Sequence, residues 1–232
     1  MAYIMDNHLT DPNDMRVDSL FSPGHTAAWK YLTELDRPWE ALPLIASYVR
    51  ELGESLDISE YDKHPDNVLV HKTAAIAPSA YLGKNIIIGA NTEVRHNAFI
   101  RNDVLIGENV VVGNSTELKN VILFDYVQVP HFNYVGDSIL GYKTHFGAGV
   151  ITSNVKSDHS PVSVCYGKTR IETGLIKFGA ILGDNVEVGC NAVLNPGTVI
   201  GSKTTVYPLS MTRGFIPAGC IYKKQGEITE KR

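Results

Sequence analysis

Branched aliphatic residues recur at every sixth position along the middle of the chain. One series runs without a gap from Val70 to Leu118, and a second runs from Ile176 to Val206. The members are Val70, Ile76, Leu82, Ile88, Val94, Ile100, Ile106, Val112, Leu118, Ile176, Leu182, Val188, Leu194, Ile200 and Val206. A fixed period of this kind is typical of repeat architectures, in which each repeat packs against its neighbours. We predict that these side chains form the inner rows of a stacked β structure.

Glycine and asparagine occupy the other positions of the repeat in a regular way. Glycine follows the aliphatic residue at Gly83, Gly89, Gly107, Gly113, Gly183, Gly189 and Gly201. Three residues after the aliphatic residue lie Asn85, Asn91, Asn97, Asp103, Asn109, Asn185 and Asn191. Glycine, Asn and Asp are the residues that most readily adopt positive φ, so each hexapeptide predicts a short strand and a tight corner. Three such units make one coil of a triangular prism, which predicts an all-β fold, a parallel β-helix. A β-sandwich or a right-handed β-helix is the alternative.

The segments on either side of the repeat predict a division of the chain into three parts. Residues 1–69 form an N-terminal extension, residues 70–207 form the β-helix, and residues 208–232 form a tail. Within the extension, residues 1–23 are polar and predict no regular structure, whereas 26–35 and 38–52 predict two short helices. The repeat slips near residues 129–135 and breaks at 156–174, where alternating residues around Tyr166–Lys168 predict a hairpin insertion.

Composition narrows the classes of partner. The formal net charge of -4 provides no positive field for nucleic acid or anionic membranes, although it permits a small phosphorylated ligand. The sequence has no signal-peptide pattern and no run of 18 apolar residues, so we expect a cytoplasmic protein without a membrane partner. Its three cysteines include no CxxC pair and make a poor disulfide framework.

Three motifs around the first slip carry candidate chemistry. They are Gly113-Asn-Ser-Thr-Glu-Leu-Lys119, His131-Phe-Asn-Tyr-Val-Gly-Asp137 and Gly147-Ala-Gly-Val-Ile-Thr-Ser-Asn154. From Phe99 to Val206 the chain resembles the acetyltransferase half of the bifunctional family that joins glucosamine-1-phosphate N-acetyltransferase to a sugar-1-phosphate nucleotidylyltransferase. The hairpin insert resembles the archaeal type. The resemblance implies a left-handed β-helix that assembles as a homotrimer.

The same resemblance implies roles for individual residues. His131 corresponds to the general base, and the pKa range of histidine suits proton removal near neutral pH. Glu117 corresponds to a residue that orients the imidazole or the substrate amine. Arg101 and Lys119 correspond to residues that bind the sugar phosphate, for which arginine offers a two-pronged grip. We expect acyl transfer from acetyl-coenzyme A to an amino-sugar phosphate such as glucosamine 1-phosphate, with no metal required.

The remaining matched positions divide between the two substrates. Tyr134, His145, Asn154 and Lys177 match positions of the sugar site, and Ala148, Cys190 and Lys224 match positions that contact acyl-coenzyme A. Two of these depart from the family, because His145 replaces an asparagine and Cys190 replaces a serine. Nothing upstream resembles a nucleotidylyltransferase, so we expect an acyltransferase half without that domain.

Two other classes of function stay open. A non-catalytic trimeric module that binds sugar nucleotides is compatible with the missing nucleotidylyltransferase and the altered His145. A metal enzyme related to the γ-carbonic anhydrases needs three histidines, and here only His96 and His131 stand at plausible positions, because residue 136 is glycine.

Overall fold

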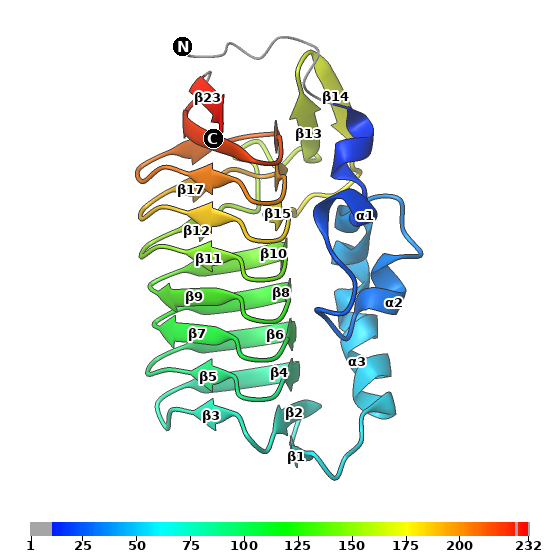
Figure 1. The fold of residues 1–232 in the computed structure, drawn as a ribbon. Helices are drawn as coiled ribbons and strands as arrows, with labels where there is room; N and C mark the ends of the chain where they lie inside the picture. Colours follow the sequence, from blue (N-terminus) through cyan, green and yellow to red (C-terminus); the bar gives the residue numbers. More distant parts are fainter. Residues whose placement is uncertain (1–10, 226, 232) are drawn as a thin grey trace.

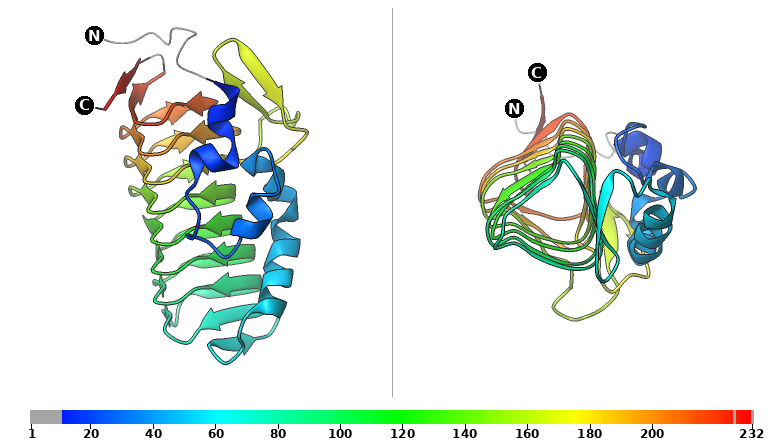
Figure 2. Two further views of the ribbon diagram at one scale, coloured as in Figure 1. Left: turned by 45° about the vertical axis from the view of Figure 1, so that its right-hand side comes forward. Right: turned by 90° about the horizontal axis from the view of Figure 1, so that it is seen from below.

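The chain folds as a left-handed parallel β-helix with a helical extension along one side (Figure 1). The computed structural model describes residues 11–225 and 227–231. Seen along its axis, the β-helix is a triangular prism, and the helices lie against one of its three sides (Figure 2). The predicted fold class is therefore confirmed. No helix in the described ranges has the length and apolar character needed to cross a membrane.

Two large sheets form the walls of the prism. The first contains β1 (Tyr61–His64), β2 (Val68–His71), β4 (Tyr81–Ile88), β6 (Phe99–Ile106), β8 (Glu117–Leu123), β10 (Tyr134–Leu140), β12 (Ile151–Thr152), β15 (Ala180–Leu182), β17 (Val193–Leu194), β18 (Thr198–Ile200), β20 (Met211–Thr212) and β21 (Phe215–Ile216). The second contains β3 (Ala75–Ile76), β5 (Glu93–Val94), β7 (Val111–Asn114), β9 (Gln128–His131), β11 (His145–Phe146), β16 (Glu187–Val188), β19 (Thr205–Val206), β22 (Cys220–Lys224) and β23 (Glu227–Glu230). Except for the end strands β1 and β23, neighbouring strands pair in parallel, so equivalent residues of successive coils stack.

The interior and the corners follow the repeat. In successive coils Leu82 pairs with Ile100 and Ile100 pairs with Leu118, and both Ile100 and Leu118 are fully buried. Positive φ occurs at the predicted Asn85, Asn91, Asn97, Asp103, Asn109, Asn185 and Asn191. One predicted inner position is wrong: Ile176 is 46% exposed, because it lies in the segment that returns from the insertion to the prism.

The N-terminal extension contains more structure than the sequence predicts. It comprises the 3₁₀ helix η1 (Pro12–Met15), α1 (Val17–Leu20), α2 (Trp29–Leu32), the 3₁₀ helix η2 (Pro38–Leu44) and α3 (Ile45–Ser55). The predicted helix at 26–35 is a single α-turn, and the one at 38–52 begins as 3₁₀ helix up to Leu44, the residue after Pro43. The absence of structure predicted for residues 1–23 is wrong for 11–23, and residues 1–10 lie outside the described residues. Met15 and Leu20 are almost fully buried against the prism, and this packing stabilises the short helices.

One side of the prism is apolar on its outer surface, and the extension covers it. The outward residues there are Ile87, Leu105, Ile122, Ile139, Ile181 and Val199, all buried. The helix α3 packs against β4, β6 and β8, and η2 packs against β10. Asp184, 4% exposed, fixes the earlier part of the extension, because its carboxylate accepts hydrogen bonds from the backbone N–H groups of Ser22 and Tyr142 at 2.7 and 2.9 Å.

The predicted hairpin insertion is present, whereas the predicted C-terminal tail belongs to the β-helix. The antiparallel hairpin of β13 (Ser163–Tyr166) and β14 (Thr169–Glu172) leaves the prism as predicted, and β13 packs near β21. The segment predicted as a tail, 208–232, instead continues the coils. Val206 pairs with Tyr222, whose side chain is buried and donates a hydrogen bond to the Met211 carbonyl at 2.8 Å. Interior apolar contacts therefore extend the prism beyond residue 207.

Candidate active site

Four of the predicted site residues fall in one column along a corner of the prism. The register aligns Phe146 with Val188, Val188 with Val206, and Val206 with Tyr222, and β11 continues it to β9. Two residues after these aligned positions, the same register forms a second column, which contains His131, Ala148, Cys190 and Lys224. Neighbouring strands lie about 4.8 Å apart, so the four coil steps from His131 to Lys224 span about 19 Å. The fold therefore places His131 in one column with the three residues that the sequence predicts to contact acyl-coenzyme A.

The backbone at His131 is fixed while its side chain is exposed. The His131 N–H donates to Asn133 Oδ1 at 3.1 Å, and the His131 carbonyl accepts from the Gly149 N–H at 3.0 Å. Asn133 is buried and also donates to the Gly147 carbonyl at 2.9 Å. In the coil below, Gly113 allows close approach, because a Cβ there would lie 1.6 Å from the Pro130 carbonyl oxygen. The imidazole therefore projects to solvent from a constrained corner.

A polar cluster occupies the wall that follows this corner. Arg101 extends from β6, Glu117 and Lys119 from β8, and Tyr134 from β10, with Tyr134 directly paired to Glu117. The Arg101 Nη1 donates to Glu117 Oε1 at 2.9 Å, and both side chains stay partly exposed. A guanidinium has five N–H donors, so this contact leaves donors for a ligand.

A buried carboxylate stands behind the cluster. The Asp137 side chain is 4% exposed, and its Oδ1 lies 2.9 Å from the Lys119 Nζ. The Asn120 Nδ2 donates to the same oxygen at 2.9 Å, and the Asn154 Nδ2 donates to Oδ2. Sequence reasoning included Asp137 in the second motif without giving it a role, because only the stacking of coils shows that three polar side chains converge on it.

Tyr134 contributes a neutral hydroxyl. Its oxygen accepts from the Asn154 Nδ2 at 3.3 Å. Burial raises the pKa of the Tyr134 phenol, and the nearby Asp137 and Glu117 carboxylates raise it further. The phenol therefore keeps its proton near neutral pH and has a hydrogen to donate.

Other predicted residues lie at the margins of this arrangement. His145 stands on β11, across the corner from Tyr134, with its Nδ1 2.8 Å from Glu187 Oε2. Lys177 is exposed beside Phe178, whose N–H donates to the Asn154 carbonyl at 2.9 Å. Lys224 is exposed, and its Nζ lies 3.5 Å from Glu227 Oε2. Within one chain, the segment of Lys177 is therefore joined to the cluster through the backbone of Asn154, whereas His145 pairs with Glu187.

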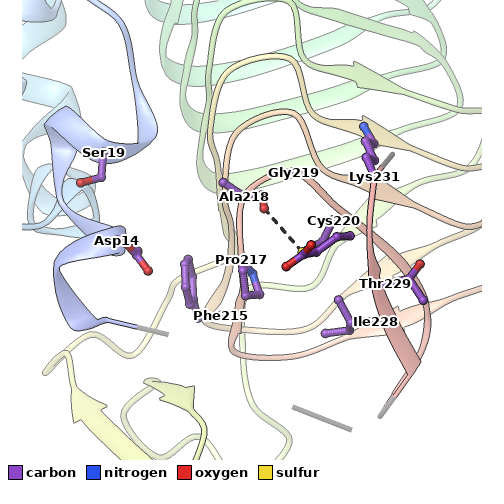
Figure 3. Close-up of a pocket in the computed structure, with 11 residues that line it drawn as sticks. Asp14, Ser19, Phe215, Pro217, Ala218, Gly219, Cys220, Ile228, Thr229 and Lys231 are labelled. Carbon is purple, nitrogen blue, oxygen red and sulfur yellow. Dashed lines mark hydrogen bonds between the residues drawn. The ribbon is translucent and has the colours of Figure 1, made fainter. Parts of the chain in front are cut away.

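A separate pocket lies at the C-terminal end of the prism (Figure 3). Residues of η1, α1, the last coil and the closing hairpin line it, including Asp14, Ser19, Phe215, Cys220, Ile228 and Lys231. Four coil steps separate the strand of Cys220 from that of His131. None of the predicted site residues is among those that line this pocket, so it is distinct from the candidate site.

The histidines considered for a metal site are not adjacent. The register places His96 and His131 two coil steps apart, about 10 Å, whereas a histidine nitrogen binds zinc at about 2 Å. His96 Nδ1 lies 3.2 Å from Ser79 Oγ. No cluster of three His, Cys, Asp or Glu side chains suited to a metal ion occurs among the described residues.

Comparison with known proteins identifies relatives of this chain. Residues 90–207, just over half of it, match the family described as the GMPPB C-terminal domain. The Bifunctional protein GlmU of Methanococcus vannielii is 29% identical over 223 residues, which cover 87% of this chain and 49% of that protein. The Putative uncharacterized acetyltransferase YaiX of Escherichia coli K12 is 28% identical over 209 residues, which cover 81% of this chain and 87% of that protein. The structure of a putative acetyltransferase from Bacillus cereus has a TM-score of 0.41 and 16% identity, and the match covers 72% of this chain and 79% of that chain.

These matches confirm the predicted resemblance to the bifunctional sugar-1-phosphate nucleotidylyltransferase/acetyltransferase group. The chain spans about half the length, or less, of the bifunctional relatives that it matches.

Proposed function

This chain belongs to the GMPPB C-terminal domain family, and from that premise we propose that it is an acyl-coenzyme A-dependent acyltransferase that acts on an amino-sugar phosphate such as glucosamine 1-phosphate. One observation carries the proposal. The exposed His131 stands in a corner column with Ala148, Cys190 and Lys224, and the Arg101–Glu117 cluster lies on the adjoining wall. A candidate base (His131), a column of residues long enough to bind acyl-coenzyme A and a candidate phosphate-binding cation (Arg101) therefore lie on one corner and the wall beside it.

The chemistry follows from the residues. The substrate amine attacks the thioester carbonyl, an amide bond forms, the carbon–sulfur bond breaks, and coenzyme A leaves as the thiol. The amine must lose one proton, and the His131 imidazole accepts it and can return it to the departing sulfur. Glu117, on β8 beside Tyr134, orients the amine.

Recognition of the sugar phosphate rests on the polar cluster. The Arg101 guanidinium keeps N–H donors beyond its contact with Glu117, and arginine can bind two phosphate oxygens at once. The Tyr134 hydroxyl supplies a neutral donor to the sugar. The acyl donor extends along the column from His131 toward Lys224, whose ammonium is suited to the phosphates of coenzyme A.

Thiol release tests the proposed function. Purified protein is incubated with acetyl-coenzyme A and, separately, with glucosamine 1-phosphate, its 6-phosphate isomer and the unphosphorylated amine. We expect release that depends on the amino sugar and is fastest with a phosphorylated one. Release at the rate of the protein-free control with every amino sugar would refute the proposal.

We expect Arg101→Ala to raise the KM for the sugar phosphate by about tenfold or more, since a charge-assisted hydrogen bond contributes roughly 1.5–3 kcal/mol. The KM for acetyl-coenzyme A should stay nearly constant. Arg95→Ala is the matched control, because Arg95 is also a partly exposed arginine paired with a carboxylate, Glu93, at 2.9 Å. Equal effects of Arg101→Ala on both KM values would contradict the phosphate role.

We propose that the active assembly is a homotrimer. The walls outside the extension carry large exposed apolar side chains, namely Tyr81, Phe99, Phe132, Ile151, Leu209 and Met211. Of these, Tyr81 and Phe99 lie side by side, with ring centroids 5.5 Å apart, and exposed apolar patches are typical of association sites. Light scattering should give about three times the chain mass of 25.5 kDa, and a clean monomer at assay concentration would contradict this assembly.

A non-catalytic sugar-nucleotide-binding module is the second candidate. It is favoured by the pairing of Lys119 with the buried Asp137, which commits one of the two predicted phosphate-binding cations to the protein itself. This candidate predicts saturable binding of a sugar nucleotide in calorimetry without any thiol release.

A further inference from the structure

We propose that Asp137 is a positioning residue that fixes the sugar-phosphate side of the site and connects it to the N-terminal extension; this inference rests on the proposed function. Asp137 lies at the corner that ends the wall bearing Tyr134, with φ of 47°. Its side chain is nearly inaccessible, so it does not itself contact a ligand. It acts through the side chains that converge on it.

The first of these is Asn154. An ionised carboxylate accepts hydrogen bonds and donates none, so the atom of Asn154 that faces Asp137 is its NH₂ group. That nitrogen also donates to the Tyr134 oxygen at 3.3 Å. Because the Tyr134 oxygen accepts this bond, its own hydrogen is directed away from the Asn154 nitrogen. Asp137 therefore sets the direction in which Tyr134 donates.

Lys119 is held in the same way. Its Nζ lies 2.9 and 3.2 Å from the two Asp137 oxygens, and its side chain is only 18% exposed. The ammonium compensates the buried carboxylate, as a buried charge requires. In this arrangement Lys119 stabilises Asp137, and Arg101 is the cation presented to the phosphate.

The extension contacts this network at two points. Asn120 Nδ2 donates both to Asp137 Oδ1 at 2.9 Å and to the Leu42 carbonyl of η2 at 3.1 Å. The Trp39 ring of η2 lies 6.0 Å from that of Phe178, whose N–H holds the Asn154 carbonyl. The extension is therefore part of the support for the site as well as the cover of one wall.

Asp137→Asn tests the inference, because it keeps the size of the side chain but replaces one acceptor with a donor. We expect the KM for glucosamine 1-phosphate to rise about tenfold, as for loss of a charge-assisted hydrogen bond, while the KM for acetyl-coenzyme A changes by less than about twofold. Asp103→Asn is the control. Asp103 stands at the same corner two coils away, has φ of 58° and accepts from Asn85 Nδ2 at 2.6 Å. It should change neither KM.

A second measurement does not depend on turnover. Hydrogen exchange of the Asn154 side-chain amide, followed by NMR and assigned with Asn154→Ala, should be slow in the unaltered protein. It should become at least about tenfold faster in Asp137→Asn and stay unchanged in Asp103→Asn. If the unaltered protein releases no thiol, the proposed function fails, and this amide signal still decides the positioning role. Unchanged exchange in Asp137→Asn, or equal increases of both KM values, would overturn the inference.

Discussion

Replacing His131 with alanine should lower kcat for acyl transfer by about 10²–10⁴-fold, the usual contribution of a positioned general base. The KM values should change little, because the imidazole acts on the proton that is transferred and leaves the phosphate and coenzyme A contacts intact. Thiol release under saturating substrates measures the effect. Since the side chain is exposed, we expect the melting temperature to stay within about 2 °C of the unaltered protein.

His96→Ala is the matched control for this prediction. His96 is an exposed histidine in the same corner column, two coil steps below His131. Its replacement should leave kcat unchanged. If His131→Ala keeps the full rate, another group removes the proton, and the assignment of His131 as the base is wrong.

The second large effect concerns stability. Ile122 points outward from β8 but is fully buried beneath the extension. Ile122→Asp removes this apolar contact and places an unpaired carboxylate in a dry interface, so we expect the free energy of unfolding to fall by about 4 kcal/mol or more. Chemical denaturation measures that loss, and the melting temperature should fall by at least about 8 °C.

Val111→Asp provides the comparison. Val111 also points outward, but on the second sheet, where its neighbours in the adjacent coils are Glu93 and Gln128. A carboxylate there reaches water, so the change should cost less than about 1 kcal/mol. Equal losses for the two variants would show that the extension does not depend on the apolar wall.

The sequence predicts the regular coils well because each inner residue obeys a local rule. A buried side chain at every sixth position, with Asn or Asp at the corner, requires no knowledge of distant contacts. The sequence also indicates which wall is covered. In the runs Ile86–Ile88, Val104–Ile106 and Val121–Leu123 the middle residue, which points outward, is apolar as well. Residues 11–23 have no period, and the buried Leu20 is fixed by a coil some 160 residues later, in which the Asp184 N–H donates to the Leu20 carbonyl and the Asp184 carboxylate accepts from the Ser22 N–H.

For the candidate site, the amino-acid order already specifies which side chains are present and, through the repeat, which wall or corner each occupies. Residues 17 or 18 apart become neighbours about 4.8 Å apart by stacking, so Arg101 could be grouped with Lys119, and Glu117 with Tyr134, in advance. The contacts of Asp137 with Lys119, Asn120 and Asn154 became visible only in the folded chain, because the choice of partner among nearby polar groups depends on burial. Folding also makes Ala148 and Cys190 adjacent, since the hairpin insertion separates them along the chain and no local pattern tells where the chain re-enters the prism.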